Sequence, residues 1–376
     1  TAPTAPNYRA GDAYPLTFTN CCTTPLPSGT GNTTSDPQFV NASANNYRLL
    51  PGSPCLNAGL NEDWMTNALD LDGNARIIPD GGTNDMGAYE FKPGSLMCNL
   101  IADSPEGLAP HEVVFTAYAG GTNTTISDYK WDFTKDGSHH EEGADKQIVT
   151  NPYSTLVVYS VIAYVINSAG EVATRTNQNY IKVGPDTAYV SPSGSPSSPY
   201  TNWATAATNI QDAIDAGVDG TLVLVTNGPY VLTNQISITN GITVRSVNGK
   251  TLTTVDGNNS VRGFYLLHSN AVVDGFTITN GSTSMDGGGV YCDHGGTVQN
   301  YLIISNSADT GLYVGYGGGV YCDQSGLVSN CVISGNSSYL HGGGVCLYQG
   351  GTVKNSTITV NSARTDGGYG GGVRCY

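Results

Sequence analysis

The sequence predicts an all-β protein whose C-terminal half is a solenoid of stacked parallel strands, a parallel β-helix. Three observations lead to this prediction: an internal repeat of 25 to 30 residues, an abundance of Gly, Asn, Thr and Tyr, and a scarcity of charged residues and helix formers. Charged residues make up 12% of the 376 residues, and 49 residues are Gly. Gly and Asn readily adopt the positive φ angles of tight turns, whereas helices favour Lys, Glu, Leu and Met.

The repeat is marked by the string GGGV, which recurs at spacings of 30, 25 and 28 residues. Its copies are Gly287–Val290, Gly317–Val320, Gly342–Val345 and Gly370–Val373. A unit of this length, with two short apolar runs and no helical period, cannot bury its own apolar face. Stacked units can share a continuous core. In GGGVYC the alternation of a strand places Val290 and Cys292 inward and Tyr291 outward.

A second string follows the glycines and carries asparagine at two places. It reads TVQNYLIISNSA from Thr297, LVSNCVISGNSS from Leu327 and TVKNSTITVNSA from Thr352, with an earlier copy, AVVDGFTITNGS, from Ala271. This alignment groups Asp274 with Asn300, Asn330 and Asn355, and it groups Asn280 with Asn306, Asn336 and Asn361. Equivalent residues of stacked coils lie about 4.8 Å apart, so both sets are predicted to be structural ladders.

The nine cysteines leave the disulfide pattern and the redox compartment open, because there is no CxxC pair and the count is odd. The alternation predicts an inward column of Cys292, Cys322 and Cys375, with Leu347 in the third copy. Cys346 lies one residue earlier in its copy and is predicted to face outward.

The segment before the repeats resembles the N-terminal end of a known family. WATAATNIQDAIDAG, from Trp203 to Gly217, is predicted as an amphipathic helix, and TLVLVT, Thr221–Thr226, as a buried strand. Together with YVSPSG and ISITNGITVRSVNG, they resemble the cap and first coils of bacterial right-handed parallel β-helix proteins of the pectate-lyase-like superfold. The resemblance implies that residues 186–376 form a cap and coils, and that the helix closes the open end of the solenoid.

Residues 1–95 are similar to the C-terminal closing segment of large bacterial surface β-helix proteins. The similarity is carried by DPQFVN, NYRLLPGSPCLNAG, DLDGNARI and DMGAYEF, in which Asp, Gly and Pro indicate turn-rich chain.

Residues 96–185 contain alternating runs such as HEVVFTAYAG and STLVVYSVIAYVIN, which predict strands. YKWDFTKDGS and YSVIAYVINSAG resemble a PKD domain, an immunoglobulin-like β-sandwich that serves as a spacer or binding unit. The turn after Trp131 departs from the family pattern, because Thr134 and Lys135 lengthen it by one residue.

A catalytic site is sought because many polysaccharide lyases and glycosidases share the β-helix fold, although a fold alone does not imply a function. Asp293 and Asp323 both follow GGGVYC and are predicted to lie about 5 Å apart, the carboxylate separation of a retaining glycosidase. Later copies have Tyr348 and Tyr376 at this place. No Arg or Lys stands at neighbouring coil positions, so the pair is interpreted as a solvated turn and no catalytic residue is predicted.

Metal ligands are considered at two places, and no cofactor other than calcium is suggested. Asp70, Asp72 and Asn74 are spaced like the start of an EF-hand loop, but Gly81 occupies the place of its closing Glu. A calcium site and a hydrogen-bonded Asx turn both remain open. His139 and His140 lie beside two glutamates and are interpreted as an exposed polar loop.

Charge and hydropathy exclude several partners. The net charge is −15 and only 15 residues are Lys or Arg, so no basic surface for nucleic acid or an anionic membrane is expected. No apolar run is long enough to insert into a bilayer.

These observations predict a secreted, extracellular or cell-surface protein that is structural or adhesive rather than enzymatic. The order of segments, closing region, spacer, then cap and coils, suggests part of a tandem array that associates with itself head to tail into a fibre. The alternative is a β-helix that binds or degrades extracellular polysaccharide.

Overall fold

The computed structural model describes residues 17–42, 45–77, 82–91, 96–121, 125–309, 315–364 and 370–376. The chain forms two compact units. The first comprises residues 1–105, 112–151 and 159–181, and the second comprises residues 106–111, 152–158 and 182–376. Strands dominate both, and no helix in the described ranges is long and apolar enough to cross a membrane.

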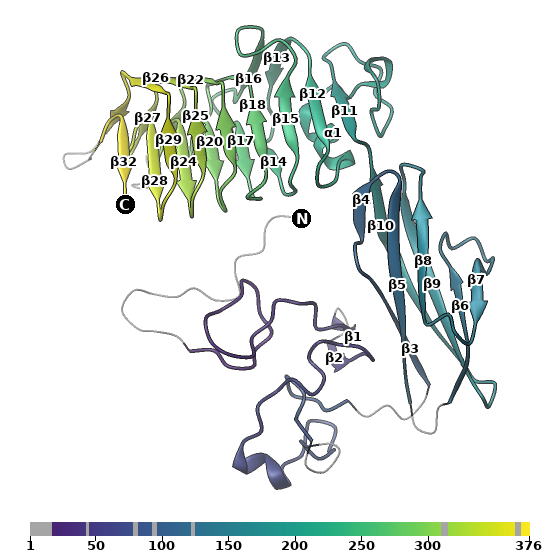
Figure 1. Ribbon diagram of the computed structural model, residues 1–376. Helices are drawn as coiled ribbons and strands as arrows, with labels where there is room; N and C mark the ends of the chain where they lie inside the picture. Colours follow the sequence, from purple (N-terminus) through teal and green to yellow (C-terminus); the bar gives the residue numbers. More distant parts are fainter. Residues whose placement is uncertain are drawn as a thin grey trace. The chain divides into compact units, whose positions relative to one another are not determined.

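The second unit contains a solenoid of parallel strands whose coils stack along one axis (Figure 1). The first solenoid sheet consists of β11 (Thr187–Val190), β12 (Leu222–Val225), β15 (Thr243–Ser246), β18 (Val272–Asp274), β21 (Thr297–Gln299), β25 (Leu327–Ser329) and β29 (Thr352–Lys354). The second consists of β13 (Gly228–Val231), β16 (Thr253–Asp256), β19 (Thr277–Thr279), β22 (Leu302–Ile304), β26 (Val332–Ser334) and β30 (Thr357–Thr359).

The third solenoid sheet is the one that carries the glycine repeat. It consists of β14 (Ile236–Ile238), β17 (Phe264–Leu266), β20 (Val290–Cys292), β24 (Val320–Asp323), β28 (Val345–Tyr348) and β32 (Val373–Cys375). A short fourth sheet joins β23 (Ser307–Ala308), β27 (Ser337–Ser338) and β31 (Ser362–Ala363). The prediction of an all-β chain with a solenoid of parallel strands is therefore confirmed.

Inward side chains of successive coils form one core. The column Cys292, Cys322, Leu347 and Cys375 pairs in register, as the alternation predicts, and its first three members are buried whereas Cys375 is exposed. Val273, Ile303 and Phe264 are examples of side chains with no exposed surface. Each fully buried residue of this kind contributes about 1.5–3 kcal/mol of hydrophobic free energy, so the stacking of coils is the main source of stability.

A ladder of asparagine side chains runs along the turn after the second sheet. The Asn336 Nδ2 donates to Asn361 Oδ1 at 2.9 Å and to the Ile303 carbonyl at 2.9 Å, and Asn336 Oδ1 accepts from the Asn306 backbone N–H at 2.9 Å. Asn306 and Asn336 are 1% and 0% exposed. The ladder therefore gives the buried Asn306 N–H a side-chain acceptor in the next coil and bonds carbonyls of its own and of the preceding coil.

Asn280 differs from the predicted alignment by one residue. Thr279 pairs with Ile304, which places Asn280 beside Ser305 and Gly281 beside Asn306. The Gly281 N–H accordingly donates to Asn306 Oδ1 at 2.8 Å. The ladder ends at Gly281, and Asn280 instead bonds Asp256 at 3.1 Å. The same shift places Asp274 beside Gln299, so it does not belong with the first asparagine set.

The other asparagine set serves the backbone. Asn300, Asn330 and Asn355 have φ angles of 64°, 55° and 50°, in the left-handed region that Asn tolerates better than most residues. They mark the corner between the first and second sheets, where the chain turns between two short strands. Their shared role is conformational, although the Asn300 Nδ2 also donates to Asp274 Oδ1 at 2.7 Å. The buried ladder acts through hydrogen bonds.

The triple-glycine runs before β20, β24, β28 and β32 permit close contact between coils. A Cβ on Gly318 would lie 2.1 Å from the Ser337 carbonyl oxygen and 2.6 Å from the Gly343 carbonyl oxygen, closer than any side chain permits. Backbone N–H groups of one triple-glycine run donate to carbonyls of the next, for example Gly318 to Gly342 at 3.2 Å. The glycines are therefore required by packing.

Among the coils whose third-sheet strands begin at Val290, Val320 and Val345, differences in length are confined to one connection. From the fourth sheet to the third, the separations are 12 residues from Ala308 to Val320, 7 from Ser338 to Val345 and 10 from Ala363 to Val373. In these coils the connection from the third sheet to the first is constant, at 5 residues from Cys292 to Thr297, from Cys322 to Leu327 and from Leu347 to Thr352.

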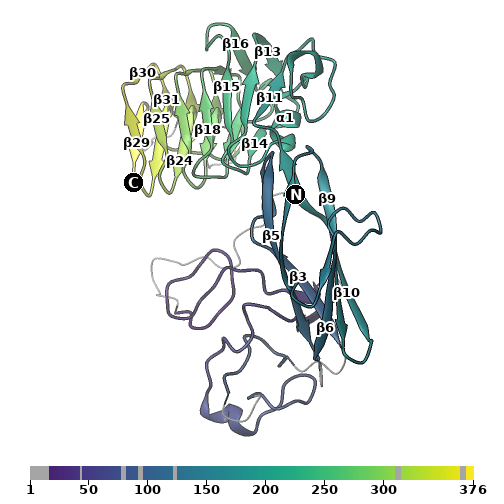
Figure 2. The same cartoon turned by 45° about the vertical axis from the view of Figure 1, so that its right-hand side comes forward.

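The predicted helix at the start of the solenoid is shorter than expected. The structure has a 3-10 helix, η3 (Trp203–Thr205), and a separate helix, α1 (Ile210–Ala216). The break arises because Ala207 bridges Val190 as extended chain, and Asn209 then caps α1 by accepting the Asp212 N–H. Helix α1 contacts β11, β12 and β14 and covers the first coil (Figure 2).

Two sheets face one another in the middle of the chain. One joins β3 (Met97–Ala102), β5 (His111–Gly120) and β8 (Ile148–Tyr153). The other has the order β4 (Glu106–Leu108), β10 (Val172–Gly184), β9 (Val158–Asn167), β6 (Ile126–Asp132) and β7 (Glu141–Gly143). Trp131 of β6 is fully buried against Phe115 of β5, with ring centroids 5.8 Å apart.

Residues 17–91 contain little regular structure, as their turn-rich sequence predicts. The described elements are β1 (Phe39–Asn41), β2 (Asn46–Leu49) and the 3-10 helix η2 (Asp63–Asn67). Buried polar groups hold the chain: Asp85 accepts the N–H groups of Asn57 and Phe91, each at 2.7 Å. Arg76 pairs with Glu90 at 3.2 Å. Satisfied polar contacts of this kind compensate for a small apolar core.

We expect Asn336→Ala to lower the free energy of unfolding by about 2–4 kcal/mol, because it removes the side-chain acceptor of the buried Asn306 N–H and the Nδ2 donor to the Ile303 carbonyl and to Asn361. The matched control is Asn330→Gly, because Asn330 is exposed and glycine accepts its positive φ. The control should change stability by no more than about 0.5 kcal/mol. Urea denaturation followed by circular dichroism measures both, and equal losses would contradict the buried ladder.

Candidate functional site

The outer face of the third solenoid sheet gathers aromatic and charged side chains. Tyr265, Tyr291 and Tyr321 occupy one outward column in successive coils. The rings of Tyr265 and Tyr291 are stacked with centroids 5.0 Å apart, and Tyr291 meets Tyr321 edge-on at 5.0 Å. Tyr265 and Tyr291 are half-buried, while Tyr321 is only 7% exposed. We call these three residues the tyrosine column.

Asp293, one of the two predicted carboxylates, lies against this column. It accepts the Tyr265 hydroxyl at 2.9 Å and the Tyr291 hydroxyl at 3.4 Å. His294 Nδ1 lies 3.5 Å from the same carboxylate. Burial and the proximity of Asp293 raise the pKa of both tyrosines, so the phenols stay protonated and remain hydrogen-bond donors at neutral pH. These contacts assign Asp293 an evident structural task.

Asp323, the second predicted carboxylate, belongs to the next coil. Its strand β24 pairs with β20 through Cys322 and Cys292, so the two aspartates follow equivalent positions. Asp323 itself pairs with Tyr348 in the coil beyond. Asp293, Asp323 and Tyr348 therefore follow one another at equivalent positions of three successive coils, as the sequence indicates.

Arg262 is a member of this site that sequence reasoning missed. Its guanidinium lies 5.2 Å from the centroids of both Tyr265 and Tyr291. It is 8% exposed and donates to the carbonyl of Gly287 at 2.9 Å and of Asp286 at 2.7 Å. Burial lowers its pKa, and the neighbouring tyrosines and aspartates oppose that shift. The cation is therefore occupied in supporting the tyrosine column.

Arg262 could have been found by extending the repeat one coil backwards. Phe264 pairs with Val290, so Arg262 stands where Gly288 stands in the next coil. The GGGV string is absent from this earlier coil, and a search for that string alone does not reveal the equivalence.

Cys346 is buried, contrary to the prediction that it faces solvent. It lies in the outward register, between Tyr321 and Arg374, yet it has no exposed surface. Aromatic rings gather over this part of the face: Tyr316 lies 6.3 Å from Tyr321 and 6.0 Å from Tyr376. An outward direction on a strand therefore does not ensure exposure when neighbouring segments cover the sheet. Burial raises the pKa of the Cys346 thiol to about 12.

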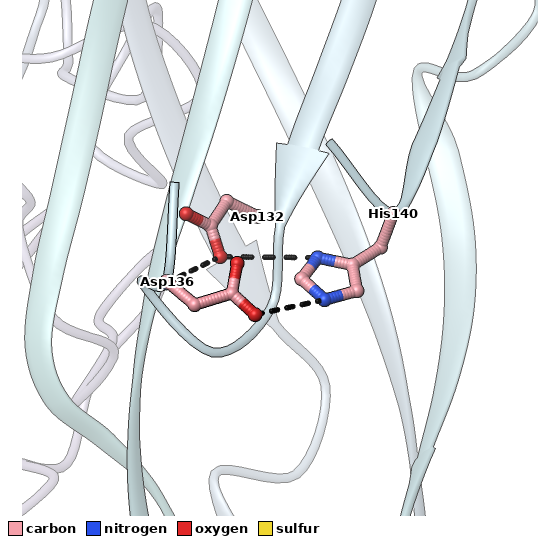
Figure 3. A group of neighbouring side chains, drawn as sticks. All are labelled: Asp132, Asp136 and His140. Atoms are coloured by element: carbon pink, nitrogen blue, oxygen red, sulfur yellow. Dashed lines mark hydrogen bonds and ion pairs between the residues drawn. The ribbon is translucent and has the colours of Figure 1, made fainter. Parts of the chain in front are cut away.

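A second group of potential ligands lies in the turn after β6. Figure 3 shows the imidazole of His140 facing the carboxylates of Asp132 and Asp136. His140 Nδ1 is 3.8 Å from Asp132 Oδ1, and His140 Nε2 is 3.8 Å from Asp136 Oδ2. Among the described residues, this is the one group of three His, Cys, Asp or Glu side chains whose ligand atoms lie within 4.8 Å of one another.

The hydrogen bonds of this group explain it as a turn. Fully buried Asp132 accepts the N–H groups of Thr134 at 3.1 Å, Asp136 at 3.2 Å and Gly137 at 2.8 Å. The Phe133 N–H donates to His140 Nδ1 at 3.3 Å, which leaves that nitrogen as an acceptor. A metal ion would have to replace these bonds with its own. The group therefore stabilises the lengthened turn of this sandwich.

The candidate calcium turn has a similar construction. Asp70 Oδ1 accepts the N–H groups of Asp72 at 2.9 Å and Asn74 at 2.7 Å, and its Oδ2 accepts the Glu90 N–H at 2.8 Å. Asp72 is paired with Arg48. Three potential oxygen ligands are thus engaged: the two carboxylate oxygens of Asp70 in hydrogen bonds of the turn, and one oxygen of Asp72 in the ion pair. Gly81, at the place of the closing Glu of an EF-hand loop, lies outside the described residues. Calcium at this turn remains a prediction.

Asp70 has a pKa below its ordinary value. Burial acts to raise the pKa, but the hydrogen bonds from Glu90, Asn74 and Asp72 to the ionised carboxylate outweigh it. The stability that Asp70 contributes is therefore fully present above the unfolded pKa of about 3.9. It is lost as pH falls through the folded pKa, because the unfolded chain takes up the proton first.

We expect Asp70→Asn to flatten the loss of stability between about pH 5 and pH 3, and to cost about 1–3 kcal/mol at neutral pH. The control is Asp63→Asn, a change at an exposed carboxylate. Melting temperatures across this pH range, with calcium and with a chelator, provide the measurement. An unchanged acid profile in Asp70→Asn would contradict the Asx turn, and a rise in stability with calcium would identify a metal site.

Comparison with solved structures finds a similarity to a PKD domain. No family model matches the sequence, and no curated protein matches it. The crystal structure of the PKD1 domain of Vibrio anguillarum Epp is 18% identical and covers 24% of this chain and 99% of its own, with a TM-score of 0.19. A TM-score this low carries no argument about function, so the description of this chain as all-β with a solenoid of parallel strands rests on its own strand pairing.

Proposed function

We propose that this chain is a non-catalytic extracellular protein with a structural or adhesive role, of the kind built from a right-handed parallel β-helix and a PKD-type spacer in bacterial surface proteins. The observation that carries this proposal is the engagement of Asp293. A general acid or nucleophile must reach its substrate, whereas this carboxylate is held by two tyrosine hydroxyls. Arg262, the nearby cation, is likewise occupied by backbone carbonyls.

The order of the segments supports a tandem arrangement. Residues 17–91, similar to a closing segment, precede the sandwich, and the capped coils follow it. In a tandem array, a closing segment of this kind ends one solenoid and the next cap begins another. Self-association head to tail is the corresponding proposal for the partner, because parallel coils can continue across a junction.

A second candidate function, binding of polysaccharide, is favoured by the tyrosine column. The half-buried rings of Tyr265 and Tyr291 present apolar surface, which suits the C–H faces of sugars. Asp293 and the net charge of −15 disfavour anionic polysaccharides. We therefore propose a neutral polysaccharide as the ligand of this face.

Catalysis is tested by comparing the wild type with Asp293→Asn. The full chain is incubated with a neutral glucan, xylan and polygalacturonate, and reducing ends and unsaturated products are measured. We expect no product from the wild type or from Asp293→Asn. Product formed by the wild type and lost in Asp293→Asn would contradict the non-catalytic proposal.

Affinity electrophoresis in the same polysaccharides tests adhesion. We expect retardation by a neutral polysaccharide, weakened in Tyr291→Ala by a factor of about 2 to 10, which corresponds to the loss of one aromatic contact of about 0.5–1.5 kcal/mol. Tyr47→Ala is the control, because Tyr47 is 46% exposed and belongs to the other compact unit. Equal retardation of both variants would contradict binding at the tyrosine column.

A further inference from the structure

Two cysteines that are distant in sequence meet in the turn-rich region of residues 17–91. Cys22 is half-buried and bridges Thr33, and its thiol donates to the Ser35 carbonyl at 3.1 Å. Cys22 is thereby fixed beside the segment that begins at Ser35. A thiol held in this way needs only to rotate about its side-chain bonds to exchange one partner for another.

Cys55 is brought to the same segment by its own turn. The Cys55 N–H donates to Ser53 Oγ at 3.1 Å, and the Ser53 hydroxyl donates to the Pro37 carbonyl at 2.6 Å. The Cys22 thiol is therefore bonded to the carbonyl of Ser35, and the turn at Ser53–Cys55 is bonded to the carbonyl of Pro37, two residues further along the same segment. The Cys55 side chain is 2% exposed and lies in hydrogen-bonding contact with the Cys22 thiol.

Three other cysteines, Cys292, Cys322 and Cys21, lack this combination of contact and access. Cys292 and Cys322 are also neighbours, but both have no exposed surface in the solenoid core. Cys21 is half-buried like Cys22, and its thiol donates to the Thr19 carbonyl at 3.3 Å. Cys22 and Cys55 form a pair in which one thiol can be reached from solvent and the other is already beside it.

We propose that Cys22 and Cys55 form a disulfide by exchange with a low-molecular-weight or protein disulfide. The Cys22 thiol loses its proton and attacks one sulfur of the oxidant, which releases the other sulfur as a thiol. Cys55 then loses its proton and attacks the Cys22 sulfur of the mixed disulfide, which releases the second thiol. Two protein thiols are oxidised, and one disulfide is reduced to two thiols.

The order of these steps follows from access and acidity. Burial and the neighbouring Cys22 raise the pKa of Cys55 to about 11, so Cys55 is a poor first nucleophile at neutral pH. Cys22 is the thiol that an external disulfide can reach. Once Cys22 carries the mixed disulfide, Cys55 reacts within the molecule at high effective concentration.

The bond would restrain a region that has little else to fix it. It would close the chain from Cys22 to Cys55 and tie residues 17–42 to the polar core that includes Asp85 and Glu90. Disulfides stabilise chiefly by limiting the unfolded chain, and loop-rich segments with small apolar cores benefit most.

The test uses the full chain, reduced and then incubated with oxidised glutathione under native conditions. Trypsin would release both Cys21 and Cys22 in residues 10–48 and Cys55 in residues 49–76. We expect mass spectrometry without reduction to find these two peptides linked in the wild type and in Cys21→Ser, and unlinked in Cys22→Ser and Cys55→Ser. The melting temperature of this region should rise on oxidation in the wild type and Cys21→Ser only.

Three outcomes would overturn the proposal: no linked peptides in a protein that is otherwise folded, linkage that persists in Cys22→Ser, or linkage only between separate molecules. Cys55→Ser changes a buried residue and could disturb the turn. Cys22→Ser alters a half-buried thiol and keeps the test decisive, because circular dichroism can establish that it folds like the wild type.

Discussion

The solenoid depends on the rule that buried backbone groups need hydrogen-bond partners. Each coil turns several times within a short stretch, and at each corner the strand ladder is interrupted. Asn306, Asn336 and Asn361 solve this problem at one corner by donating and accepting along the stack. The triple-glycine runs solve it at another by letting backbones approach closely enough to bond directly. The apolar core can be continuous because these corners are satisfied.

Much of this architecture could be predicted because stacked coils repeat their constraints. The recurrence of GGGV identified the third sheet and the inward column of Cys292, Cys322 and Leu347, which the pairing reproduces. Asn280 was misplaced because an alignment of letters favours matching asparagines, whereas the strand pairing follows Thr279 and Ile304. Matching asparagines in the sequence does not determine the register of the coils, because a glycine, here Gly281, can occupy the ladder position that Asn306 occupies in the next coil.

The surface was harder to predict than the core. Tyr291 was expected to face outward, but its hydrogen bond to Asp293 in its own coil and its contact with Arg262 of the preceding coil do not follow from the alternation. The burial of Cys346 depends on segments that lie outside the repeat motif. Periodicity fixes the direction of a side chain and says nothing about what covers it. The sequence therefore predicted that Asp293 and an outward Tyr291 belong to this face. It did not predict the hydrogen bonds to Asp293 or the contact with Arg262.

In the coils whose third-sheet strands begin at Val290, Val320 and Val345, length variation is confined to one connection, and this has an evolutionary consequence. Between the fourth and third sheets the chain takes 12, 7 or 10 residues, and the strands on both sides keep their register. Insertions at this edge therefore leave the core untouched, while an insertion at the five-residue corner from Cys292 to Thr297 would displace every coil that follows. The edge borders the tyrosine column, so selection can remodel the rim of that face and alter what it recognises at little risk to folding.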